Sequence, residues 1–185
     1  KIDLHFREQS LRVDGHFQKT KSKIIYYYKL LIEFMYFDFK KDFVDAYNCL
    51  KVQQMFLEYN KFIFTNNRFH QNLLNQAYLC LKLSKTDLAS SLVQKSVAYS
   101  NSKLNLAIGD CLMVNILLYN NEINKALILL DKIKSNYELE KFPVSFTQKY
   151  YLIRTCCNFI LKEYKIALLN LKQPCFSEYE MKGGV

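Results

Sequence analysis

The side chains that most often carry out catalysis or bind metals are few in this chain of 185 residues. The three histidines, His5, His16 and His70, are not spaced four residues apart, as two zinc ligands on one helix would be. No two cysteines are separated by two residues, the spacing of many zinc and dithiol sites; the six are Cys49, Cys80, Cys111, Cys156, Cys157 and Cys175. We therefore expect a protein that is not an enzyme and that binds neither a metal nor a cofactor.

Glycine and proline are scarce, with 4 and 2 residues respectively. None of the glycines forms one of the glycine-rich loops that cradle phosphates. A β-rich fold of this length needs many turns and commonly uses these two residues for them. The scarcity favours an all-α fold, in which we expect Lys, Asn, Ser and Glu to make joints that need little left-handed backbone.

Stretches of helical hydrophobic periodicity separated by short polar segments indicate four antiparallel pairs of helices within residues 22–172. Residues 1–21 are expected to form an irregular lead-in and residues 173–185 a tail. Ser145 and Gln148 have the spacing of a capping box, and His70 is expected at a helix start on the surface. The eight helices are expected at residues 22–39, 42–60, 70–83, 86–100, 104–119, 122–136, 145–161 and 164–172.

An alanine recurs early in the second helix of every pair, at Ala46, Ala89, Ala126 and Ala167, and Ala77 lies in the first helix of the second pair. The intervals between the four are 43, 37 and 41 residues. Small residues let antiparallel helices approach closely, and such a period built from helix pairs is typical of an α-solenoid. The flanking positions are Phe43, Thr86, Ile123 and Tyr164 before the alanines, and Leu50, Val93, Leu130 and Leu171 after them.

These positions resemble the tetratricopeptide-repeat (TPR) family over about residues 24–172, although Phe34, Thr86 and Val114 depart from its pattern and the period exceeds about 34 residues. PCI-type and other helical repeats are alternatives. The resemblance implies a stack whose concave face, lined by the first helices, receives a helix or extended segment of another subunit. The partner-binding candidates are Tyr27, Tyr78, Asn115 and Tyr151, and the candidates for packing between repeats are Ala46, Ala77, Ala89, Ala126 and Ala167.

Residues 72–172 are similar to the tetratricopeptide subunits of the Ccr-Not mRNA deadenylase complex, through the stretches 75–78, 111–114, 124–130 and 164–167. The anaphase-promoting complex also contains subunits with long repeats of this style. The resemblance to the deadenylase subunits implies a non-catalytic scaffold in a multisubunit assembly that assists mRNA turnover in the cytoplasm.

The net charge of +9, from 26 Lys and Arg against 17 Asp and Glu, keeps RNA or DNA as an alternative partner. The excess charge is spread along the chain, and only four of the cations are arginine, the side chain that phosphates and guanine edges favour. The one local cluster, Lys19, Lys21 and Lys23, is typical of a solvated surface. A protein partner is therefore favoured over nucleic acid.

Residues 24–39 form the most apolar run, but Lys29, Glu33 and Asp38 interrupt it within fewer than the ~20 largely uncharged residues that a bilayer requires. We expect a buried helix and no membrane contact. Aromatic residues go round this helix, which leaves open whether they pack in a core or form an exposed strip that binds a partner. The absence of a cysteine framework favours the cytoplasm, with the nucleus as the alternative.

Overall fold

The computed structural model describes residues 2–100 and 102–177, without the side chains of residues 2–5, 7 and 177. Within these ranges the secondary structure is helical and contains no strand, and neighbouring helices pack together in pairs. The prediction of an all-α chain is confirmed. Across the same ranges, no helix combines the length and the apolar character needed to cross a membrane.

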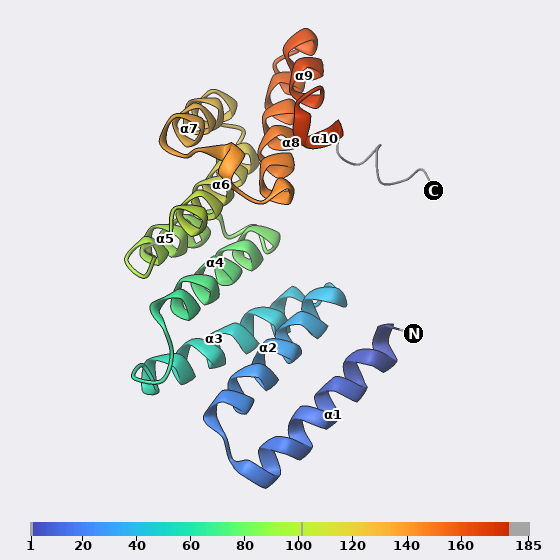
Figure 1. Ribbon diagram of the computed structural model, residues 1–185, viewed down its shortest axis with the longest axis vertical. Coiled ribbons are helices and arrows are strands. Elements are labelled where there is room, and N and C mark those ends of the chain that lie inside the picture. The colour runs from blue at the N-terminus through green and yellow to red at the C-terminus, as the bar shows by residue number, and fades with distance from the viewer. Residues whose placement is uncertain (1, 101, 178–185) are drawn as a thin grey trace. The chain divides into compact units, whose positions relative to one another are not determined.

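The chain divides into two compact units, Lys1–Ser100 and Asn101–Val185, shown in Figure 1. In unit 1 each helix packs against the next one along the chain. Its helices are α1 (Ile2–Thr20), α2 (Lys23–Phe39), α3 (Phe43–Tyr59), α4 (Asn66–Lys82) and α5 (Thr86–Val97).

In unit 2, α8 is central, since it contacts all the other α-helices of the unit and the 3-10 turn η1. The elements are α6 (Lys103–Tyr119), α7 (Ile123–Asn136), η1 (Leu139–Lys141), α8 (Val144–Ile160), α9 (Tyr164–Leu171) and α10 (Pro174–Ser177). The short helix α10 lies within the segment expected to be a tail, whose residues 178–185 are outside the described ranges.

Residues 2–20 form a helix, so the prediction of an irregular lead-in was wrong. The helix is stabilised by contacts with α2 that local periodicity does not reveal. The ring of Phe6 lies 6.0 Å from that of Tyr36, and the ring of Phe17 lies 5.2 Å from that of Tyr26. Asp14 adds an ion pair of 2.7 Å with Lys29.

The joints within the helix pairs depend on left-handed backbone, contrary to the expectation from their composition. Each contains one non-glycine residue with φ between 59° and 62°: Lys41, Ser84, Asn121 or Lys162. The next residue in each case donates a backbone hydrogen bond of 2.8–2.9 Å back into the preceding helix, as in a Schellman motif. This bond offsets the cost of a β-carbon in that conformation. Each left-handed residue stands five positions before an alanine, so the joint repeats with the alanines.

The start of α8 also differs from the prediction. Pro143 precedes the first residue of the helix, Val144, and no side chain caps this end, so Ser145 and Gln148 do not form a capping box. Gln148 Nε2 instead donates a hydrogen bond of 2.7 Å to the carbonyl oxygen of Cys175. Pro143 has φ of −54°, and its carbonyl oxygen accepts backbone hydrogen bonds of 2.8 Å from Phe146 and 3.2 Å from Thr147, which begin the helix.

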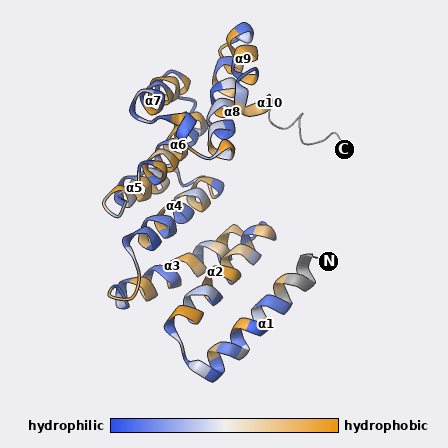
Figure 2. Cartoon of the chain, viewed as in Figure 1, coloured by the Kyte–Doolittle hydropathy of each residue, from blue (hydrophilic) through white to orange (hydrophobic). Residues whose placement is uncertain are grey.

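All five alanines are buried at 5% exposure or less. In unit 1, Ala46 lies in a core cluster with Phe34, Leu50 and Leu79. In unit 2, Ala126 lies in a larger cluster built from α6, α7, η1 and α8. Figure 2 shows hydrophobic and hydrophilic residues alternating along most helices, as expected when one face of each helix is buried.

Candidate protein-interaction surfaces

The four candidate contact residues are divided between the two units. Tyr27 and Tyr78 lie in unit 1 on α2 and α4, and Asn115 and Tyr151 lie in unit 2 on α6 and α8. Their exposure differs widely, because the sequence pattern identifies the first helix of each pair but not which side of it faces solvent.

Tyr27 is 3% exposed and cannot present its ring to a partner, so its assignment as a contact residue is wrong. The ring lies 5.1 Å from that of Phe64 and packs in a cluster with Leu57 and Phe69. The guanidinium of Arg68 lies 5.4 Å from the ring centroid. Burial raises the pKa of Tyr27, although the charge of Arg68 works in the opposite direction. Tyr27 therefore packs against α3, α4 and the joint that connects them.

Tyr78 is accessible, with 37% of its surface exposed. The ammonium of Lys82, one turn further along α4, lies 5.4 Å from its ring centroid. Partial burial and the negative charge of Asp38 on α2 raise the pKa of the Tyr78 hydroxyl. The ring therefore offers a flat, uncharged contact surface beside a cation, which suits either an apolar or an acidic group of a partner.

Tyr151 lines a pocket of about 390 Å³ on unit 2, whereas Asn115 is half-buried on α6. The pocket is formed by η1, the first half of α8 and the segment before and within α10. Gln148 holds that segment through the carbonyl of Cys175, and Thr147 Oγ1 donates a bond of 3.0 Å to the carbonyl of Leu139. The lining residues are Leu139, Glu140, Phe142, Val144, Thr147, Tyr151, Gln173, Pro174 and Cys175.

The lining of this pocket combines apolar and polar side chains, and its titratable groups are the carboxylate of Glu140, the hydroxyl of Tyr151 and the thiol of Cys175. Burial raises the pKa of Tyr151, and the charges of Cys175 and Glu140 raise it further, so the hydroxyl is protonated near neutral pH. A site of this size and polarity can accept one large side chain of a bound peptide.

A second pocket, of about 320 Å³, lies between α1 and α2 and is lined by Phe6, Ser10, Ile32, Glu33, Tyr36 and Phe37. Burial raises the pKa of Glu33, while Lys29 lowers it from 3.8 Å away. Because Lys29 also pairs with Asp14, these charges connect two helices.

His70 is buried, which corrects the prediction of a surface residue. It is 1% exposed within α4, and its Nδ1 lies 2.9 Å from the carbonyl oxygen of Ser96 on α5. Nearby on α4, Asn72 Nδ2 donates a bond of 2.8 Å to Gln53 Oε1. These polar side chains fix how α4 sits against its neighbours, which is the common role of a paired buried polar group.

The cysteines do not form a reactive cluster. Burial raises the pKa of Cys111 to about 12 and that of Cys157 to about 11, so both are thiols at neutral pH. Among the described residues, no group of three or more His, Cys, Asp and Glu side chains is placed to hold a metal ion.

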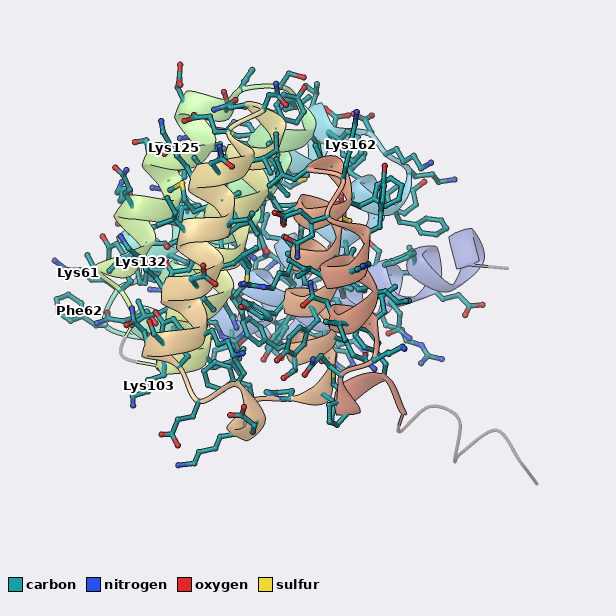
Figure 3. The ribbon with its side chains drawn as sticks, turned by 90° about the horizontal axis from the view of Figure 1, so that it is seen from above. Lys61, Phe62, Lys103, Lys125, Lys132 and Lys162 are labelled. Carbon is teal, nitrogen blue, oxygen red and sulfur yellow. The ribbon has the colours of Figure 1, made fainter. Side chains whose placement is uncertain are left out.

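Sequence reasoning missed several exposed hydrophobic residues. Phe62, in the joint between α3 and α4, is 94% exposed and projects outward beside Lys61 in Figure 3. On α3, Val44, Val52 and Met55 are exposed. Since the spacing of the α3 residues places them on one stripe, that signal was available in the sequence, whereas no pattern marks an exposed aromatic in a joint.

The chain was compared with known protein families, with curated proteins and with solved structures, and none of them matches.

Proposed function

We propose that this chain is a non-catalytic protein-interaction scaffold, built as an α-solenoid of TPR-like helix pairs within a multisubunit assembly. The recurrence of a left-handed joint residue five positions before each buried alanine supports the repeat. Stacked pairs of this kind offer long surfaces to partner segments without catalytic groups.

The observation that carries the interaction role is the pocket around Tyr151. It joins the partly exposed ring of Tyr151 to apolar and polar side chains from two helices and η1, and a bound segment would bury an aromatic or aliphatic side chain there. Tyr78 supplies an exposed aromatic ring on unit 1. The similarity of residues 72–172 to the deadenylase subunits supports the mRNA deadenylation machinery as the assembly and the cytoplasm as its location.

Affinity purification from the source organism, followed by mass spectrometry and by an assay for poly(A)-shortening activity, tests this function. The wild-type chain is expected to recover a defined set of proteins, and Tyr151→Ala to lose part of that set. Tyr119→Ala is the matched control, because Tyr119 is an exposed tyrosine of unit 2 outside the pocket. Recovery of the wild-type chain alone, as a monomer, would refute the scaffold function, and recovery without poly(A) shortening would refute the deadenylation assignment.

A further inference from the structure

An apolar surface on the last helix pair of unit 2 consists of two residues of α8, Leu152 and Phe159, and three of α9, Tyr164, Leu168 and Leu171. We call these five residues the end surface. Each is between 42% and 63% exposed, and the rings of Phe159 and Tyr164 lie 5.4 Å apart, which joins the two helices into one patch. Figure 2 shows orange, hydrophobic residues recurring along α9.

In the preceding helix pair, α6 and α7, the corresponding surface packs against another helix. The residues 41 positions earlier are Cys111, Leu118, Ile123, Leu127 and Leu130. All five belong to the core of unit 2 or pack against it, together with residues of α8. The two pairs correspond in backbone as well, since their joints place Asn121 and Lys162 at φ of 61° and 62°. In the pair formed by α6 and α7, these positions therefore bind a helix.

The helix that packs on this pair is α8, and its contacts show which kind of helix such a surface binds. Phe146, Tyr150, Ile153 and Cys157 enter the core at spacings of i, i+4, i+7 and i+11. At the i+8 position, Arg154 forms an ion pair of 2.7 Å with Asp131 of α7. The ligand is thus an amphipathic helix with a charged residue beside its apolar stripe.

The charge at the corresponding place on the last pair is reversed. The residue 41 positions after Asp131 is Lys172, which is exposed at the end of α9. Exposed lysines also stand at 149, 162 and 165, and Glu163 is the only acidic residue between positions 144 and 172. Figure 3 shows Lys162 at the joint between α8 and α9. A helix docked here needs an acidic residue where α8 has Arg154.

We propose that the end surface binds an amphipathic α-helix of a partner protein, with apolar residues at i, i+4, i+7 and i+11 and an acidic residue at i+8 that pairs with Lys172. This proposal rests on the scaffold function and adds the site and the chemistry of the partner. A second copy of this chain is disfavoured as occupant, because its net charge is +9 and self-association through this surface would bring lysines together.

Two fluorescein-labelled synthetic peptides test the site on the full chain by fluorescence anisotropy. Both copy residues 143–161 with Cys156→Ser and Cys157→Ala, and one also carries Arg154→Glu. The glutamate peptide is expected to bind about fivefold more tightly than the arginine peptide, which is the effect of exchanging one surface repulsion for an attraction. Lys172→Glu in the chain should reverse that preference.

Leu168→Glu in the chain should abolish binding of the glutamate peptide, whereas Ile128→Glu should leave it unchanged. Ile128 is a matched control, since it is 57% exposed against 54% for Leu168 and lies outside the end surface. Circular dichroism verifies that both variants fold. Absence of binding to either peptide, or a preference that Lys172→Glu does not alter, would overturn the proposal, as would a dimer in light scattering that Leu168→Glu dissolves.

The failure of the site and the failure of the scaffold function give different results. If affinity purification recovers the same partners with Leu168→Glu as with the wild-type chain, the end surface is not a docking site and the scaffold function stands. If the wild-type chain is recovered alone, the scaffold function fails whatever the peptides do. Loss of a subset of partners with Leu168→Glu, but not with Ile128→Glu, is the expected result.

Discussion

The hydroxyl of Tyr150 on α8 donates a hydrogen bond of 3.1 Å to the backbone carbonyl oxygen of Leu130 on α7. The same hydroxyl accepts a bond of 3.2 Å from Nη1 of Arg154, which also pairs with Asp131. Burial raises the pKa of Tyr150 to about 12, so the donor proton is retained over the physiological pH range. A single fully buried side chain therefore connects the two helices and orients the cation that joins them.

Replacing Tyr150 by phenylalanine should reduce the stability of unit 2 by about 1–2 kcal/mol, because the ring still fills its site but a buried hydrogen bond is lost. Amide hydrogen exchange of peptides from α7 and α8 measures this loss locally. Tyr164→Phe is the control, since Tyr164 is exposed, and it should change exchange little. Equal effects of the two substitutions would show that the bond to Leu130 does not stabilise the packing of α8.

The buried alanines predict a size limit where the helices of a pair cross. Ala89 has no exposed surface on α5, so Ala89→Leu must displace α4 and should cost about 1–3 kcal/mol in the free energy of unfolding. Ala98, at the end of the same helix, is exposed, and Ala98→Leu should be nearly neutral. Thermal unfolding of both variants measures the difference, and a stable Ala89→Leu protein would contradict the close approach of α4 and α5.

The left-handed joints predict that glycine stabilises one position and destabilises its neighbour. Lys41 has φ of 61°, so Lys41→Gly relieves a steric cost and should raise stability by about 0.5–1 kcal/mol. Lys40 has φ of −71°, and its ammonium lies 5.6 Å from the ring centroid of Tyr36, so Lys40→Gly should lower stability. Urea titration compares the two variants. If Lys40→Gly raised the stability and Lys41→Gly lowered it, Lys41 would not be the left-handed residue of this joint.

The all-α fold and the approximate positions of the eight expected helices could be predicted, because periodicity and helix stops are local signals. The predicted start of α4 was wrong, since this helix begins at Asn66 and not at residue 70. The helix at residues 2–20 could not be predicted, since it contains Gly15 and its apolar residues act only through contacts with α2. The left-handed joints were also missed. The absence of glycine from the joints suggested that they need no left-handed backbone. Lys41 and Asn121 nevertheless adopt it, because a backbone hydrogen bond that exists only in the folded turn stabilises that conformation.

The candidate site was predicted less well than the fold, for a related reason. The helix with Tyr27 is apolar on every side, so its periodicity does not distinguish the face that meets Phe64 from the face that meets solvent. Polar residues misled in the opposite direction. His70 and Asn72 suggest a surface by type, yet both are buried with partners contributed by other helices. The sequence predicted Tyr78 and Tyr151 as candidate contact residues. It did not predict the pocket around Tyr151, because η1 and α10 form part of its lining.

The thiols should differ in reactivity in the order of their exposure. The pKa of Cys111 is raised by burial from 9.0 to about 12, so its reactive thiolate is scarce at pH 8 and forms only when the pH approaches that value. Cys156 is exposed on α8 beside the buried Cys157. Iodoacetamide at pH 8, with peptide mapping by mass spectrometry, should modify Cys156 well before Cys111. In denaturant, the two should react at similar rates. Early modification of Cys111 in the native chain would contradict its burial.

The nucleic-acid alternative predicts a steep dependence of binding on salt, and we expect that dependence to be absent. Local ion pairs neutralise part of the positive charge, as between Lys125 and Glu122 and between Lys141 and Glu138. Lys125 and Lys132 project from the same helix in Figure 3, but Asp131 stands next to Lys132.

Binding of single-stranded RNA and duplex DNA, measured from 50 to 200 mM salt, should be weak, with a logarithmic slope no steeper than about −2, which corresponds to one or two phosphates. A slope steeper than about −5, weakened by charge reversal of exposed lysines, would establish an extended phosphate-binding surface and make nucleic acid, rather than protein, the principal partner.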